Sequence, residues 1–262
     1  MVSSLCFSVE SGTIIGPRRI GVYGSGGVGK SSLFASLPSV GIKPLFIDVG
    51  DGTRHLPVDR ITGIALWEDL RAALNSKELL KGYGAVIIDD MTKAEEMAAD
   101  WVVRNIRHEK GKPINGIEDY GWGKGLSHIY DEFIKIFSDL DAIVRDGLHV
   151  GFIAHECIEN VPNPEGDDWK RYEPRLQAPK SGKDSIRHRL KEWCDYLFFI
   201  GYDTAVTEDG KGRGAGTRTI YTSEMPTWIA KRRVVPGREM PDSIAYERGG
   251  VELWNEIFGK GN

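Results

Sequence analysis

The residues with the clearest chemical meaning form one glycine-rich stretch, Gly24 to Ser32. Its sequence, G-S-G-G-V-G-K-S-S, fits the pattern G-x-x-x-x-G-K-[ST] and lies between an apolar β-branched segment and a segment with helical spacing. Glycines allow the backbone amides of such a loop to wrap around phosphates, and the N-terminus of the following helix adds partial positive charge. The stretch therefore predicts a phosphate-binding loop for ATP.

Side chains in and near this loop have the types needed to hold a nucleotide and its metal ion. Lys30 is expected to reach the β- and γ-phosphates, and Ser31 is expected to bind Mg²⁺. Asp89 ends the apolar run A-V-I-I-D, so a buried strand would bring its carboxylate to the same Mg²⁺. The residues predicted to contact the nucleotide are Gly24, Ser25, Gly26, Gly27, Val28, Gly29, Lys30, Ser31 and Ser32.

Asp90 is a candidate for the group that polarises the attacking water, because it follows directly after the strand aspartate. An equally good interpretation is that it caps the next helix, since Thr92 and Glu95 have the spacing of a capping box. Asp48 and Asp51 are rival bases, because they lie at the end of a second apolar run, where ligands of α/β folds bind. For Asp51, a role in the tight turn D-V-G-D-G is an equally good interpretation.

His155 ends the apolar run H-V-G-F-I-A and would lie at the same ligand-binding edge. We expect it to contact the γ-phosphate and to report its presence to the segment that follows. The alternative is a core histidine whose ring nitrogens are hydrogen-bonded by the backbone.

Elements of an α/β fold are expected to position these groups, because apolar runs of strand length alternate with segments of helical spacing. Continuous apolar runs indicate strands covered on both faces, as in a mostly parallel sheet flanked by helices. The predicted strands are 18–24, 44–50, 83–90, 148–155 and 195–203, and the predicted helices are 31–37, 67–76, 92–106 and 127–146. We expect a single domain over 1–262, with excursions at 107–126, 156–190 and 204–218.

The composition limits where the chain works and what it binds. A formal net charge of −4 over 262 residues means that any nucleic-acid surface must be local. The cysteines Cys6, Cys157 and Cys194 are too few and too scattered for a disulfide framework, which favours a reducing, cytoplasmic setting. The start lacks the pattern of a signal peptide, and the apolar runs are too short to cross a membrane. We therefore expect no membrane partner.

The order of the motifs resembles that of the RecA-like phage ATPases, which include the single-strand-annealing Sak proteins. The resemblance covers roughly residues 18–240 and rests on the phosphate loop followed by L-F-I-D-V-G-D-G, A-V-I-I-D-D, G-W-G-K-G, G-F-I-A-H-E and W-I-A-K-R-R. It implies a RecA-like core that forms homo-oligomers on single-stranded DNA, with ATP at subunit interfaces. A phage origin would place the protein in the cytoplasm of a bacterial host.

The resemblance also implies a mobile DNA-contacting loop after His155. The segment 169–190 has seven basic and two acidic residues, a local charge of +5, and Trp169 and Tyr172 could stack on bases. The alternative is a solvated polar loop. The predicted nucleic-acid contacts are Trp169, Lys170, Arg171, Arg175, Lys180, Lys183, Arg187 and Arg189.

Lys231 and Arg233 match the basic pair that, in RecA-like assemblies, reaches the γ-phosphate bound to a neighbouring subunit. A surface basic patch is the other interpretation. One position departs from the family pattern, because Gly50 stands where RecA-like recombinases have a glutamate. Asp51 or Asp90 would have to substitute, or hydrolysis would be slow.

Three functions are compatible with these features. The first is an ATP-dependent protein that binds and anneals single-stranded DNA in phage recombination. The second is an ATP-gated switch or assembly ATPase with a protein partner, which the amphipathic segment 251–258 could dock. A small-molecule kinase ranks last, because no helix-rich lid with clustered arginines is found in the sequence.

Overall fold

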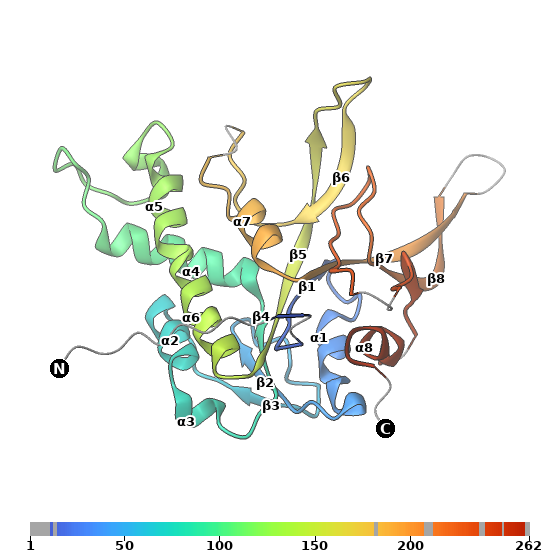
Figure 1. Ribbon diagram of the computed structural model, residues 1–262. Coiled ribbons are helices and arrows are strands. Elements are labelled where there is room, and N and C mark those ends of the chain that lie inside the picture. Colours follow the sequence, from blue (N-terminus) through green and yellow to red (C-terminus); the bar gives the residue numbers. More distant parts are fainter. Residues whose placement is uncertain are drawn as a thin grey trace.

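A computed structural model of the chain describes residues 11–12, 15–180, 183–206, 212–235, 239–247 and 249–259 (Figure 1). The strands are β1 (Arg19–Gly24), β2 (Pro44–Asp48), β3 (Asp59–Ile61), β4 (Ala85–Asp89), β5 (His149–Val161), β6 (Trp169–Pro174), β7 (Tyr196–Val206), β8 (Gly212–Tyr221) and β9 (Ser243–Ala245). The helices are α1 (Lys30–Ala35), α2 (Trp67–Leu74), α3 (Lys77–Leu80), α4 (Met91–Asn105), α5 (Lys124–Phe133), α6 (Lys135–Arg145), α7 (Ile186–Trp193) and α8 (Val251–Phe258), with 3-10 turns η1 (Leu37–Val40) and η2 (Ile117–Tyr120).

The strands form one mixed sheet in the order β3-β2-β4-β5-β1-β7-β8-β9. All neighbours from β3 to β7 are parallel, whereas β8 and β9 are antiparallel additions at one edge. The five predicted strands are the parallel strands β1, β2, β4, β5 and β7. The expected α/β core, a mostly parallel sheet of the P-loop NTPase type flanked by helices, is therefore confirmed.

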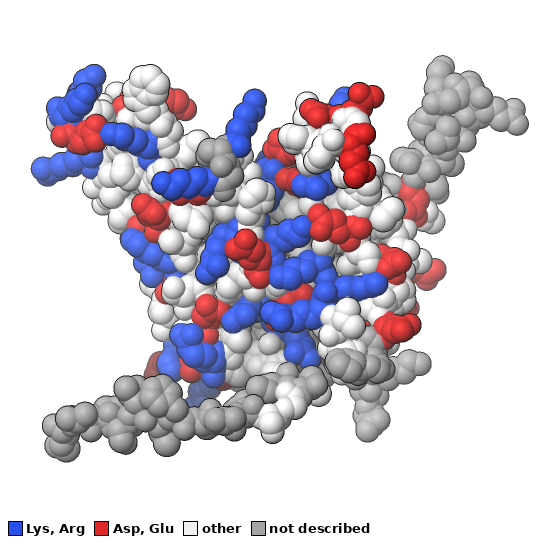
Figure 2. Space-filling model, turned by 45° about the horizontal axis from the view of Figure 1, so that its top comes forward, with Lys and Arg blue, Asp and Glu red and all other residues white. Residues whose placement is uncertain are grey.

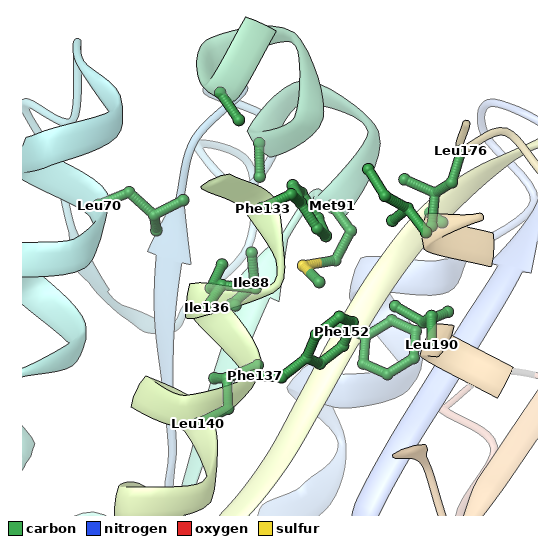
Figure 3. Close-up of a cluster of buried hydrophobic side chains, with 14 of the residues drawn as sticks. Leu70, Ile88, Met91, Phe133, Ile136, Phe137, Leu140, Phe152, Leu176 and Leu190 are labelled. Carbon is green, nitrogen blue, oxygen red and sulfur yellow. The ribbon is translucent and has the colours of Figure 1, made fainter. Parts of the chain in front are cut away.

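Helices cover both faces of the sheet, which explains the continuous apolar runs. Successive side chains of a strand point to opposite faces. In β4, Ile87 is buried with the side chains of α1 and α8, whereas Ile88 is buried with those of α4, α5 and α6. Figure 1 shows the same two helical layers. Figure 3 shows Ile88 and Phe152 of the sheet packed with Phe133, Ile136 and Phe137.

One predicted helix is divided. The segment 127–146 forms α5 and α6, which meet at Ile134. The amide of Phe137 there bonds the carbonyl three residues back rather than four, so the first helix ends and a second one starts. Phe133 and Phe137 are nevertheless both buried, because the apolar spacing continues across the junction.

About half of the segment 156–190, which was expected to be a mobile loop, is strand or helix. Strand β5 continues past the parallel sheet and pairs antiparallel with β6, from Glu156 opposite Pro174 to Val161 opposite Trp169. Helix α7 follows. Figure 1 shows this hairpin projecting beyond the sheet. Alternating half-buried and exposed positions along its first strand give it one packed face.

The other two excursions keep less regular structure. The segment 107–126 contains η2 and the first turn of α5. The segment 204–218 belongs to the ends of β7 and β8, and its residues 207–211 lie outside the described part of the chain. In the described ranges, no helix has the length and apolarity needed to span a bilayer.

Candidate nucleotide-binding site

The phosphate loop connects the end of β1 to the start of α1. Gly24, Gly27 and Gly29 have positive φ values that strain any side chain, and at two of them a Cβ would also clash. Gly24 has a φ of 155°, and a Cβ there would lie 2.3 Å from the carbonyl oxygen of Ile200. Gly29 has a φ of 103°, and a Cβ there would lie 2.8 Å from the guanidinium of Arg218. The loop therefore needs glycine both for its conformation and for close packing against β7 and β8.

Lys30 is held inside the loop by the backbone. Its Nζ donates to the carbonyl oxygens of Gly24 and Ser25 at 2.8 and 2.7 Å, and only 6% of the residue is exposed. Burial lowers the pKa of Lys30, while the carboxylates of Asp89 and Asp90 oppose that shift. The ammonium is thus positioned by the loop itself, where a bound phosphate would accept a hydrogen bond from its third N–H.

Ser31 and Asp89 lie together as the sequence predicts. The Ser31 hydroxyl donates to Asp89 Oδ2 at 2.6 Å, and Asp89 is 7% exposed. Burial raises the pKa of Asp89 to about 6, and the hydrogen bond from Ser31 partly offsets this. A hydroxyl and a carboxylate next to a phosphate pocket are the hard oxygen ligands that Mg²⁺ prefers, so these two residues fit the predicted ion.

A pocket of about 300 Å³ opens over these groups. Predicted residues that line it are Gly26, Gly27, Gly29, Lys30, Ser31, Ser32, Asp89, Asp90 and His155. Residues that line it without having been predicted as contacts are Gly50, Gly52, His55 and Ile153. The fold thus brings together, at the carboxyl edge of the parallel strands, residues from four separate segments.

Asp90 caps α4 and also lines the pocket; a role in polarising water stays a prediction. Its Oδ1 accepts a hydrogen bond from Lys93 N at 2.7 Å and so caps α4, while its Oδ2 lies 3.4 Å from His155 Nε2 in the pocket. The capping box is wrong, because Thr92 Oγ1 accepts from His155 N and the Glu95 carboxylate accepts from Gln177 N. Capping fixes the Asp90 carboxylate beside His155.

His155 lies at the junction between the sheet and the projecting hairpin. It pairs with Gly24 on the parallel side, and its carbonyl accepts a hydrogen bond from Arg175 N at 2.8 Å on the hairpin side. Burial lowers the pKa of its imidazole, whereas Asp90 opposes this shift. A group that touches the pocket is thus bonded directly to the segment predicted to contact DNA.

The rival carboxylates lie elsewhere. Asp48 is buried and accepts hydrogen bonds from the amides of Gly52 and Thr53 and from the Thr53 hydroxyl, so it shapes the turn. Asp51 is among the exposed residues, with a side chain 65% accessible and paired with Arg54 at 2.8 Å. Neither residue lines the pocket. The geometry therefore favours Asp90 over Asp48 and Asp51 as the base.

Lys231 and Arg233 lie at the opposite end of the sheet from the phosphate loop of their own chain. Lys231 Nζ donates to two carbonyls at the end of α7, and the Arg233 guanidinium pairs with Asp195. Asp195 also accepts from Arg19 N, which marks the amino end of β1. A contact with the nucleotide of a neighbouring subunit stays a prediction, and it would require both side chains to leave these partners.

Two residues far along the chain support the phosphate loop and were not predicted. Arg218 of β8 donates to Val28 O at 2.8 Å, and the Tyr246 hydroxyl donates to Gly29 O at 2.7 Å. The Arg218 guanidinium lies 4.7 Å from the centre of the Tyr246 ring. Burial raises the pKa of Tyr246 to about 12, which keeps the hydroxyl protonated as a donor. No short sequence motif predicts these two residues, because they reach the loop only through the pairing of β8 with β7 and β9.

The structure divides the predicted nucleic-acid contacts into two groups. Arg187 is 6% exposed and pairs with Glu173 and Glu159, and Arg171 also pairs with Glu173. Tyr172 stacks on Phe199 at 4.9 Å. These side chains hold the hairpin on the core, which disfavours the DNA role predicted for Arg171 and Arg187 and the stacking suggested for Tyr172; those roles stay predictions.

The remaining predicted contacts are exposed. They are Trp169, Lys170, Arg175, Lys180, Lys183 and Arg189. Figure 2 shows Lys and Arg side chains gathered across the face that carries the projecting hairpin, interspersed with acidic side chains. The local positive charge expected from the sequence is thus smaller than the residue count indicates, because part of it is neutralised in ion pairs.

Glu95 links α4 to the segment after β6 and gives the stability of the protein a pH dependence. Burial raises its pKa to about 7, although Gln177 N donates to the carboxylate. The folded state therefore binds the proton more tightly than the unfolded chain, where the pKa is near 4.5, and the free energy of unfolding falls as the pH rises from 4.5 through 7. The full effect of this group is up to about 3 kcal/mol.

We expect Glu95→Gln to raise the free energy of unfolding at pH 8 and to reduce its pH dependence, because the neutral amide keeps an acceptor for Gln177 N without a buried charge. Chemical denaturation at several pH values measures this. Glu96→Gln is the matched control, since Glu96 is exposed and pairs with Lys93 at the surface. An unchanged pH profile in Glu95→Gln would contradict the prediction.

Comparison with known proteins agrees with this geometry. The chain matches the sequence model of the AAA domain over residues 16–234, which includes every pocket-lining residue. No curated protein matches the chain significantly. With the match spanning most of the sequence, the chain belongs to the AAA domain family, whose members are generally nucleotide-binding ATPases.

Proposed function

We propose that the protein binds and hydrolyses ATP with Mg²⁺ and uses the nucleotide to control binding of single-stranded DNA. The observation that carries this proposal is the continuity of β5. One strand contributes His155 to the nucleotide pocket and then forms the hairpin that presents Trp169 and Lys170. A change at the γ-phosphate would therefore be transmitted along a single hydrogen-bonded strand.

In the proposed reaction, water attacks the γ-phosphorus of ATP and ADP leaves. Lys30 binds the phosphate oxygens and offsets their charge as the bond to the leaving oxygen breaks. The Asp90 carboxylate accepts a hydrogen bond from the attacking water, and the neighbouring His155 contacts the γ-phosphate. Ser31 and Asp89 would hold Mg²⁺, which neutralises phosphate charge when bound.

Single-stranded DNA is the proposed partner because exposed cations and an aromatic ring lie on the same projecting part of the molecule. The proposed contacts are Trp169, Lys170, Arg175, Lys180, Lys183 and Arg189. Such a surface follows a phosphate backbone and stacks on bases without reading sequence. We further propose that the protein forms homo-oligomers and acts in phage recombination or single-strand annealing, as the motif order implies.

The test is to measure the ATPase rate with and without single-stranded DNA over a range of protein concentrations. DNA binding is measured in parallel, at about 50 mM and about 200 mM salt, with ATP, ADP or no nucleotide. We expect stimulation by DNA, a steep dependence on protein concentration, and binding that weakens with salt. Absence of DNA binding at the lower salt concentration in every nucleotide state would overturn the DNA role, and a flat, DNA-indifferent rate would favour a switch with a protein partner.

A further inference from the structure

The most exposed aromatic residue of the described chain is Trp122, in the segment 107–126. Its side chain has a relative accessibility of 102%, so it packs against none of the residues that the structure describes. Large aromatic side chains are normally at least partly buried in a monomer, because their burial contributes strongly to stability. A fully exposed tryptophan therefore indicates a contact surface.

The backbone around Trp122 is shaped to hold the ring outward. Gly121, Trp122 and Gly123 all have positive φ values, of 68°, 49° and 73°. Two glycines adopt this conformation at no cost, but for a bulky side chain it is strained. Such strain persists where the surrounding structure imposes it, and it is concentrated at functional sites.

The surrounding structure does impose it, because the residues on both sides of this turn are anchored. Before the turn, the Tyr120 hydroxyl donates to the carbonyls of Val102 and Ile106 at the end of α4. After the turn, α5 packs so closely that a Cβ on Gly125 would lie 2.3 Å from the Ile117 carbonyl oxygen. Trp122 is thus presented on a fixed support, which reduces the entropy lost on binding.

The turn also lies next to the segment that follows the nucleotide pocket. Gln177 Nε2 donates to Leu126 O at 2.9 Å, and the Ser127 hydroxyl donates to Asp184 Oδ2 at 2.6 Å. These bonds join the start of α5 to the stretch that contains Lys180 and Lys183. In Figure 1, the 107–126 segment and the β5–β6 hairpin project on the same side of the molecule, with α7 between them.

The charges around Trp122 are mixed, with a small excess of cations. Its own segment, 107–126, has four basic and three acidic residues, a net charge of +1, and the adjoining stretch adds the exposed Lys180 and Lys183. Lys124 is paired with Glu109 at 2.7 Å, so it contributes less. An exposed aromatic ring among cations is the combination that binds single-stranded nucleic acid, by stacking on a base while lysines neutralise phosphates.

We propose that Trp122 is a base-stacking contact for single-stranded DNA, positioned by the strained turn Gly121–Gly123 at the end of the surface that begins at the β5–β6 hairpin. This inference rests on the proposed function and extends the DNA surface to a segment more than forty residues earlier in the chain than the basic stretch. If Trp122 stacks on a base, the affinity for single-stranded DNA depends on the bases as well as on the phosphates.

The experiment measures the affinity of the full chain, with ATP and Mg²⁺, for oligo(dT) and for an abasic oligonucleotide of the same length. We expect Trp122→Ala to bind oligo(dT) about 10-fold more weakly and Trp122→Phe to retain most of the affinity. The abasic strand should bind both variants and the wild type equally. Because no charge is removed, the salt dependence of Trp122→Ala should match the wild type, whereas Lys180→Ala should reduce the slope by about one phosphate contact.

Leu79→Ala is the control, because Leu79 is an exposed apolar residue of α3. It should leave DNA affinity unchanged. If the wild type binds oligo(dT) and Trp122→Ala binds equally well, or loses the same affinity for the abasic strand, the base-stacking role is wrong and the proposed function stands. If the wild type binds neither strand, both proposals fail.

Discussion

Replacement of Lys30 by alanine is expected to weaken ATP binding by about 10- to 100-fold. The ammonium is buried, and the loop carbonyls of Gly24 and Ser25 hold it in place, so no water or other side chain replaces it at the phosphates. Charge-assisted hydrogen bonds of this kind contribute about 1.5–3 kcal/mol each, and about 1.4 kcal/mol corresponds to a tenfold change in affinity. Isothermal titration with ATP and Mg²⁺ measures the loss directly.

Lys43→Ala provides the control for this experiment. Lys43 lies at the surface, where its side chain is 61% accessible and pairs with Asp59. Its removal should leave ATP affinity unchanged. An Lys30→Ala protein that folds normally and binds ATP like the wild type would show that the pocket over the glycine loop is not the nucleotide site. The ATPase rate of this variant also gives the background for every activity measurement proposed above.

Replacement of Arg187 by alanine is expected to lower the free energy of unfolding by about 3 kcal/mol. Arg187 is buried, and its guanidinium contacts the carboxylates of Glu173 and Glu159 as well as Leu176 O. Glu173 is 4% exposed and would keep only Arg171 as an ionic partner. The loss is large because a buried carboxylate that loses a partner cannot be hydrated. Chemical denaturation of the purified variant measures it.

The same variant tests the distinction between structural and DNA-contacting cations. The folded fraction of Arg187→Ala should keep its affinity for single-stranded DNA at a temperature well below its unfolding transition. Lys183→Ala is the comparison, because Lys183 is exposed in the same charge run. It should keep wild-type stability within about 0.5 kcal/mol and bind DNA more weakly. A stable Arg187→Ala protein with weakened DNA binding would contradict the structural assignment.

The parallel core was predictable because its signals are local. Each buried strand is a continuous apolar run, and alternation of strand and helix leaves few arrangements that cover both faces. The phosphate loop was predictable for a related reason. The loop motif, the position of Lys30 and the start of α1 all lie within one contiguous stretch of sequence.

Other parts of the site were not predictable because they depend on contacts between distant segments. His55 reaches the pocket through the turn that Asp48 organises, and Arg218 and Tyr246 reach the phosphate loop through the pairing of β7, β8 and β9. Asp51 is the reverse case. Its position in the sequence suits a catalytic base, but its turn directs the side chain toward Arg54 rather than into the pocket.

The sequence by itself determined that the chain has an α/β core with a phosphate loop, because continuous apolar runs, helical spacing and a contiguous glycine motif encode both locally. Only the tertiary structure decided which charged residues are available to a ligand. Arg187 and Lys183 belong to one basic run, yet packing buries the first against Glu173 and leaves the second exposed. The residue type fixes the charge of a side chain, but the segments packed against it decide whether that charge is hydrated, paired or accessible to a ligand.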